Sequence, residues 1–214
     1  MENHKAKTRF RELNILNLGY GQFPSNNKYG IPTIKQTNIE EDIIKKYPLQ
    51  GFNYALTSKH PYDIGVHFFL HDYQFERVWE KPSRYADVLS KFRYVLSPDF
   101  SPYADMPIAT QLYNVYRNRW CGTYWQSQGI TVIPTITLGS PELFDVCVSG
   151  VEKNSIIAIS TMGEGRWGDY KGIKSYWNRI LTTLEPKAII LYGKDLSKEL
   201  PGNIIYKPYN SSRS

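Results

Sequence analysis

Short apolar and β-branched runs recur along the chain, and segments with helical spacing separate them. The runs cover Gly65–Leu70, Phe92–Leu96, Ile130–Ile136, Ser155–Thr161, Ala188–Gly193 and the shorter Asn203–Tyr206. Runs of this length and composition are typical of buried strands. Between them, apolar residues at helical spacing predict helices, the longest from about Pro107 to Gly129. Strands that alternate with helices predict parallel β-α-β units.

The pattern therefore predicts an α/β fold of five to six mostly parallel strands alternating with helices. An open three-layer sheet and an incomplete β/α barrel both fit, and the pattern does not choose between them. Residues 1–50 are rich in Gly, Pro, Asn and Ser, which favour loops. We expect an irregular, loop-rich N-terminal arm over 1–50 and the α/β domain over 51–214.

Three side chains at predicted strand ends are candidate catalytic residues. In both architectures ligands bind where the carboxyl ends of parallel strands meet. His71 and Asp72 follow the first run and Asp99 follows the second. Two carboxylates at one edge can divide into acid and base or share a divalent metal ion, with His71 in support. The alternative is that each aspartate caps the next helix.

A second set of polar residues is expected to position a substrate. Ser101, Thr135 and Ser160 also follow predicted strands, and Ser101 lies in a Pro- and Asp-rich loop that should be rigid. Gln111 and Asn114 begin an amide stripe on the long predicted helix. Amides in place of Lys and Glu favour a semi-buried polar network or a lined cleft over a solvated face.

Composition adds a modest positive charge and many aromatic residues. The 214 residues carry a net charge of +6 and include 17 Tyr, 9 Phe and 5 Trp, and the basic excess lies near the two chain ends. Basic ends suit a nucleic acid, although the same charge also serves solubility. Cationic side chains near stacking aromatics are the candidate nucleic-acid contacts: Arg117, Arg119, Arg166 and Lys171.

Several classes of protein are disfavoured. No apolar run follows the N-terminal charges as in a secretory signal, and no run approaches the length of a membrane span. Two cysteines make no disulfide framework and no C-x-x-C zinc motif. We expect a cytoplasmic protein without a membrane partner.

Part of the sequence resembles a known bacterial family. The segments that carry the likeness are Val95–Ser101, Gln111–Trp120 (QLYNVYRNRW), Gly129–Thr135, Asn27–Pro32 and Ile157–Thr161. They resemble a family found in prophages, plasmids and integrative elements, known as domain of unknown function 4417. The resemblance implies a mobile genetic element in a bacterial cytoplasm, and it implies no reaction.

Three functional hypotheses follow. The first is a phage or mobile-element protein that binds or processes DNA or RNA in the host cytoplasm. The second is a hydrolase-like enzyme whose acidic strand-end cleft holds Asp72 and Asp99, with a divalent metal as an optional cofactor. The third is a non-catalytic phage effector that inhibits a host or defence protein. So many aromatic residues would also serve a homo-oligomer interface.

Overall fold

Seven parallel strands form the centre of the molecule. A computed structural model of the chain describes residues 17–162 and 170–209. Within them the strands are β1 (Leu49–Gly51), β2 (Gly65–His67), β3 (Tyr94–Leu96), β4 (Val132–Ile133), β5 (Ile156–Ser160), β6 (Ala188–Gly193) and β7 (Ile204–Pro208). They pair in the order β1-β2-β3-β4 and β5-β6-β7. One parallel bridge, between Thr135 and Ala158, joins the two sheets.

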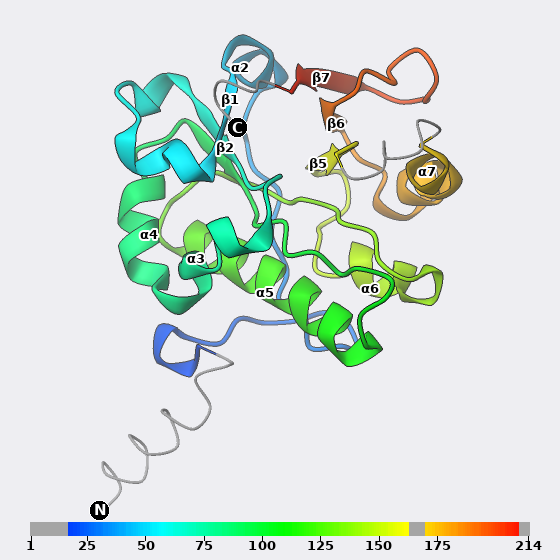
Figure 1. Cartoon of the computed structure of the whole chain (residues 1–214), viewed down its shortest axis with the longest axis horizontal. Coiled ribbons are helices and arrows are strands. Elements are labelled where there is room, and N and C mark those ends of the chain that lie inside the picture. Colours follow the sequence, from blue (N-terminus) through cyan, green and yellow to red (C-terminus); the bar gives the residue numbers. More distant parts are fainter. Residues whose placement is uncertain (1–16, 163–169, 210–214) are drawn as a thin grey trace, which may run out of the picture.

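Helices surround these strands on the outside (Figure 1). The α-helices are α2 (Glu41–Lys46), α3 (Arg77–Glu80), α4 (Pro82–Leu89), α5 (Ile108–Ser127), α6 (Phe144–Val148) and α7 (Lys171–Leu184). Short 3-10 turns add η2 (Leu18–Tyr20), η3 (Phe52–Thr57), η4 (Pro61–Asp63), η5 (Asp72–Gln74) and η6 (Pro141–Leu143). Mostly parallel strands alternating with helices confirm the predicted fold class.

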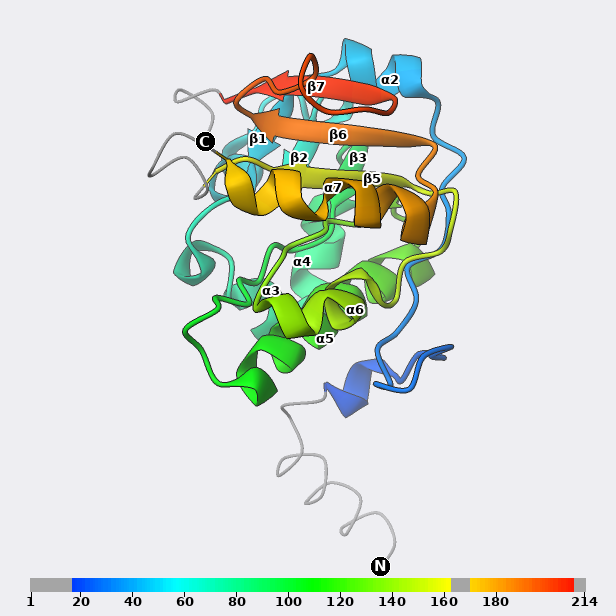
Figure 2. The ribbon, with the colours of Figure 1, turned by 90° about the vertical axis from the view of Figure 1, so that its right-hand side faces the viewer.

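The two sheets curl into an incomplete barrel. In a flat sheet of this strand order, β2 and β6 would lie about 19 Å apart, four strand spacings. Instead the ring of His67 on β2 lies 4.4 Å from that of Tyr192 on β6, and Phe69 lies 5.1 Å from the same ring. Figure 2 shows β5, β6 and β7 in front of β1, β2 and β3. The structure therefore has the barrel architecture, and the open three-layer sheet is excluded.

One apolar cluster of the described residues fills the barrel, and others attach the helices. The inner cluster contains side chains from every described strand except β2, and it also contains Phe69, which follows β2. Its strand members include Leu49, Tyr94, Ile133, Ala158, Ile190 and Ile205. Outside β1–β4, Trp79 of α3 and Trp120 of α5 pack in one cluster. Outside β5 and β6, Trp177 of α7 packs in another. Much of the aromatic excess is therefore core.

A lysine and a helix span the seam between β7 and β1. The Lys207 ammonium donates hydrogen bonds to the backbone carbonyls of Lys45 (3.1 Å) and Tyr47 (2.9 Å), just before β1. Helix α2 lies beside β7 at this seam (Figures 1 and 2). Side-chain contacts thus bridge the strands where an eighth strand would close the barrel.

The strand count and the N-terminal boundary differ from what the hydropathy pattern indicated. Seven strands are present where five to six were expected, and the additional strand is β1. Its three residues, Leu49–Gly51, are too few to produce a visible run. The predicted boundary at residue 50 falls inside this strand, and α2 also precedes it. Residues 17–50 therefore supply a helix and most of one strand to the barrel.

Candidate active site

A pocket of about 520 Å³ opens at the carboxyl ends of the strands. Its wall comes from the segments after β2, β3, β4 and β5 and from Tyr209 after β7. The residues that line the pocket include Phe69, His71, Asp99, Ser101, Tyr103, Ile136, Thr137, Ile159, Ser160 and Tyr209. Loops after parallel strands converge at this edge of a barrel, so the pocket lies where the sequence predicted a site.

Asp99 is the titratable group whose chemistry the pocket changes most. Burial raises the pKa of its carboxyl from 3.8 to about 7. The Thr137 hydroxyl, which donates a hydrogen bond to Asp99 Oδ1, opposes this increase in pKa, whereas the negative charge of Asp72 adds to it. Near neutral pH the carboxyl is therefore present in both protonated and ionised forms.

Asp72 holds the loop after β3 and does not line the pocket. Its carboxylate accepts hydrogen bonds from the Ser101 backbone N–H (3.0 Å) and the Ser101 hydroxyl (2.9 Å). From the other side, the Asn114 amide donates to the Ser101 carbonyl at 2.7 Å. Ser101 is therefore fixed within the pocket wall. This geometry favours a positioning role for Asp72 over proton transfer.

We expect Asp72→Asn to lower the pKa of Asp99 and to reduce the unfolding free energy by about 1–3 kcal/mol. The substitution removes a nearby negative charge and disturbs two hydrogen bonds to Ser101. Carboxyl ¹³C titration by NMR and urea unfolding measure the two effects. Asp63→Asn, at an exposed aspartate of η4, is the matched control. An Asp99 pKa that stays fixed or rises in Asp72→Asn would contradict the coupling.

The amides of α5 form a buried network behind the pocket. Gln111 donates to the Met106 carbonyl and to the Ser140 hydroxyl, both at 2.8 Å, and accepts from the Ser140 N–H at 2.9 Å. Asn118 accepts a hydrogen bond from the Ser97 hydroxyl at 2.7 Å. The polar-network interpretation of the stripe is thus confirmed. Gln111 and Asn114 do not line the pocket, so they position its loops and do not contact a substrate there.

The two arginines of α5 are internal, which corrects their predicted role as nucleic-acid contacts. Arg119 is 1% exposed and donates to the carbonyls of Thr135, Cys147 and Ser149. Arg117 is also buried, pairs with Glu76 and lies 3.9 Å over the Phe100 ring. Their charge is satisfied inside the protein, where a polyanion does not reach.

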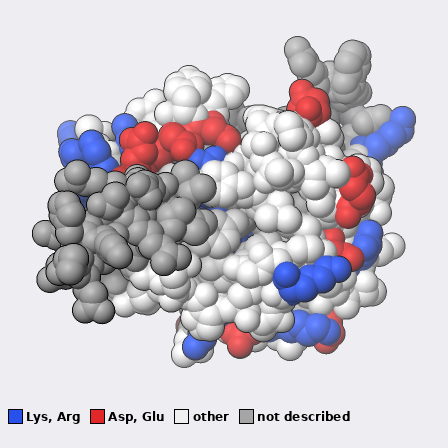
Figure 3. All heavy atoms as spheres, turned by 90° about the horizontal axis from the view of Figure 1, so that it is seen from below, with Lys and Arg blue, Asp and Glu red and all other residues white. Residues whose placement is uncertain are grey.

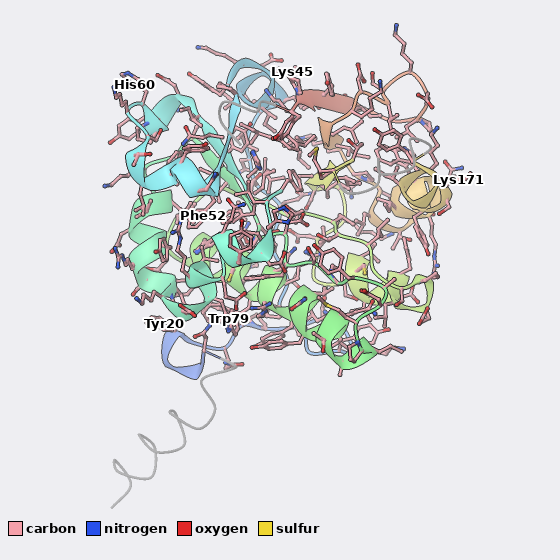
Figure 4. All side chains as sticks on the ribbon, in the orientation of Figure 1. Tyr20, Lys45, Phe52, His60, Trp79 and Lys171 are labelled. Carbon is pink, nitrogen blue, oxygen red and sulfur yellow. The ribbon has the colours of Figure 1, made fainter. Side chains whose placement is uncertain are left out.

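The remaining predicted residues are divided between the pocket and its surroundings. Ser160 and His71 line the pocket, and the His71 ring is stacked on Tyr73. Thr135 is fully buried and its hydroxyl donates to the Ser97 carbonyl at 2.8 Å, so it does not reach a substrate in the pocket. Lys171 begins α7 on the outside of the molecule (Figure 4). Arg166 lies outside the described residues.

Tyr209 is one of the pocket residues that sequence reasoning did not single out. It follows β7 directly, and its ring contacts Tyr192 at 6.4 Å. The available signal was its place after the last predicted strand, the same rule that indicated Asp99. The predicted strand at Asn203–Tyr206 is short and ends two residues earlier than β7 does.

No metal cluster is seen in the described part of the chain, and the face drawn in Figure 3 shows no single basic field. Within 17–162 and 170–209, no three His, Cys, Asp or Glu side chains come together as metal ligands. A divalent metal cofactor therefore stays a prediction. On the face in Figure 3, basic and acidic side chains are interspersed.

Comparison with known proteins identifies the family. A family described as "Domain of unknown function (DUF4417)" matches residues 23–209. The chain belongs to this family. The DUF4417 resemblance predicted from the central segments is thus confirmed. The match covers the barrel from before α2 to Tyr209, and therefore every described strand and the whole described pocket lining.

Relatives of this DUF4417 chain occur in mycobacteriophages. The Gene 1 protein of Mycobacterium phage L5 is 37% identical over 186 residues, which cover 86% of this chain and 79% of the relative. The Gene 1 protein of Mycobacterium phage D29 is 36% identical over 185 residues, covering 86% and 67%. No solved structure matched the chain. Among the described helices, none has the length and apolar character needed to cross a membrane.

Proposed function

We propose that this phage-family protein is an enzyme that uses Asp99 as a general acid–base group in a hydrolytic reaction. The observation that carries the proposal is the placement of this carboxyl in a strand-end pocket with a pKa of about 7. A general acid–base group works best when its pKa lies near the operating pH. Perturbed carboxyls in such pockets are characteristic of functional sites.

Two hydroxyls of the pocket wall support the proposal. Hydroxyls of Ser101 and Ser160 line it, where they can hydrogen-bond a substrate or a water molecule. In the proposed step, water attacks the substrate and the bond to the leaving atom breaks. Protonated Asp99 gives its proton to the leaving atom. The proton released by the attacking water restores the acid form of Asp99.

Turnover of a panel of glycosides, esters, phosphodiesters and nucleosides by wild type and Asp99→Asn tests this proposal. Because the protonated carboxyl is the active form, we expect wild-type activity to fall as pH rises through about 7. Asp99→Asn should lose at least about a hundredfold in turnover, while Asp63→Asn should lose none. Unchanged turnover in Asp99→Asn, at normal folding, rules out this role.

A nucleic-acid transaction stays a prediction based on charge and family context. Two of its four expected contacts, Arg117 and Arg119, are buried, which weakens the case for a surface that tracks a phosphate backbone. A gel shift at several salt concentrations is the direct test, because phosphate contacts give strongly salt-dependent affinity. Inhibition of a host or defence protein and homo-oligomer formation likewise stay predictions, to be tested by pull-down and by sedimentation.

A further inference from the structure

Two exposed tyrosines line the pocket. Tyr103 follows β3 and Tyr209 follows β7, and both line the pocket while 53% and 48% exposed. In the strand order β1 to β7, these two strands are separated by three others on a curled sheet. Single exposed aromatic rings are ordinary. Two that line one small-molecule-sized pocket, on segments after strands that three others separate in the barrel, are candidates for stacking on one ligand.

The pocket between the tyrosines has an apolar part and a polar edge. Phe69, Ile136 and Ile159 supply the apolar part. Asp99 and the hydroxyls of Ser101, Thr137 and Ser160 supply the polar edge, because each of them can form hydrogen bonds. No Lys or Arg is among the described lining residues, so these residues offer no cationic partner for a phosphate group. The lining suits a ring that is apolar on its faces and polar at its rim.

We propose that the pocket binds a planar nucleobase, stacked between Tyr103 and Tyr209 with its amide edge toward Asp99. This inference rests on the proposed function and specifies its substrate class. A carboxyl can accept from one ring N–H and, when protonated, donate to a neighbouring acceptor, which matches the edge of a base. Flat bases stack on aromatic side chains regardless of identity. The volume of about 520 Å³ lies within the range of small-molecule sites and leaves room for an attached sugar.

The same base chemistry can come from a free nucleoside or from a base displaced from a strand. Isothermal titration with the four ribonucleosides, a short single-stranded oligonucleotide and methyl glucoside separates these sources. We expect at least one nucleoside or the oligonucleotide to bind at least tenfold more tightly than methyl glucoside. Preference for the oligonucleotide assigns the strand-borne source, and preference for a nucleoside assigns the free one.

Tyrosine variants test the stacking itself. Tyr103→Ala and Tyr209→Ala should each weaken binding by about 5- to 150-fold, because each removes one stacking face. Tyr103→Phe should keep the affinity, since the ring is retained. Tyr62→Ala, at a tyrosine of η4 that is 71% exposed and does not line the pocket, is the matched control and should bind as wild type does.

The outcomes separate this inference from the proposed function. Methyl glucoside binding as tightly as every nucleoside and the oligonucleotide overturns the nucleobase assignment, and so does binding that is unaffected in both alanine variants. Neither result changes the role of Asp99, which the loss of turnover in Asp99→Asn decides. Conversely, tyrosine-dependent nucleoside binding with full turnover in Asp99→Asn supports the ligand and overturns the acid–base role.

Discussion

Asp99→Asn is expected to stabilise the protein at pH 8 by up to about 4 kcal/mol. Burial raises the pKa of this carboxyl from 3.8 to about 7 in the folded state, and each unit corresponds to about 1.4 kcal/mol. Below about pH 4 both the folded and the unfolded chain carry the protonated acid, so Asp99 does not lower the free energy of unfolding there. Between about 4 and 7 the unfolded state ionises first, and stability falls. Above about 7 the loss is constant.

The stability difference between variant and wild type should therefore depend on pH. Asparagine cannot ionise and has nearly the same shape, so it avoids the cost of a buried charge. Urea unfolding at pH 4, 5.5, 7 and 8 measures the difference, with Asp63→Asn as the exposed control. A difference that stays constant from pH 4 to 8 would show that Asp99 has an ordinary pKa. A gain in stability with a loss of turnover is the pattern of a strained catalytic group.

Arg119→Met is expected to reduce the unfolding free energy by about 3–5 kcal/mol. The guanidinium donates to the backbone carbonyls of Thr135 (2.8 Å), Cys147 (2.6 Å) and Ser149 (2.9 Å). Removing it leaves three acceptors without their donor, in a region where water does not replace it. Lysine keeps the charge but lacks the planar fork of donors, so Arg119→Lys should recover only part of the loss.

The same substitution at an exposed arginine is the control for Arg119. Arg179 of α7 pairs with Asp145 at 2.8 Å, and both side chains are largely exposed. Because surface ion pairs contribute little, Arg179→Met should cost less than about 1 kcal/mol. Denaturant unfolding of both variants gives the comparison. Equal losses would mean that the carbonyl contacts of Arg119 add nothing to its stabilising effect.

The strands and long helices could be predicted from sequence because their patterns are local. Ile130–Ile136 and Ser155–Thr161 are rich in β-branched residues, and the helical spacing of α5 stops shortly before Gly129. The barrel was one of two predicted alternatives, and the choice between it and an open sheet could not be made from the sequence. Its curvature depends on contacts across the interior, such as that of His67 with Tyr192, which join residues far apart in the chain.

The site could be predicted in part for a similar reason. Asp99 follows a strand, and strand ends converge, so its position alone indicated a pocket residue. The arginines of α5 were misassigned because charged residues are normally exposed. Burial of Arg119 depends on carbonyls that the segment from Thr135 to Ser149 brings over it, and no local pattern shows this.

The single bridge between the two sheets has a mechanical consequence. At the Thr135–Ala158 bridge, the Ile136 N–H donates a backbone hydrogen bond to the Ala158 carbonyl (2.8 Å) and the Ala158 N–H donates one to the Pro134 carbonyl (2.9 Å). Each sheet keeps its own hydrogen-bond ladder on either side. A small rotation about this junction would leave both ladders intact, and it would be opposed by the ring contacts of His67 and Phe69 with Tyr192 and by the Lys207 hydrogen bonds at the seam. Because Asp99 belongs to one half and Ser160 to the other, such a hinge would change the width of the pocket directly.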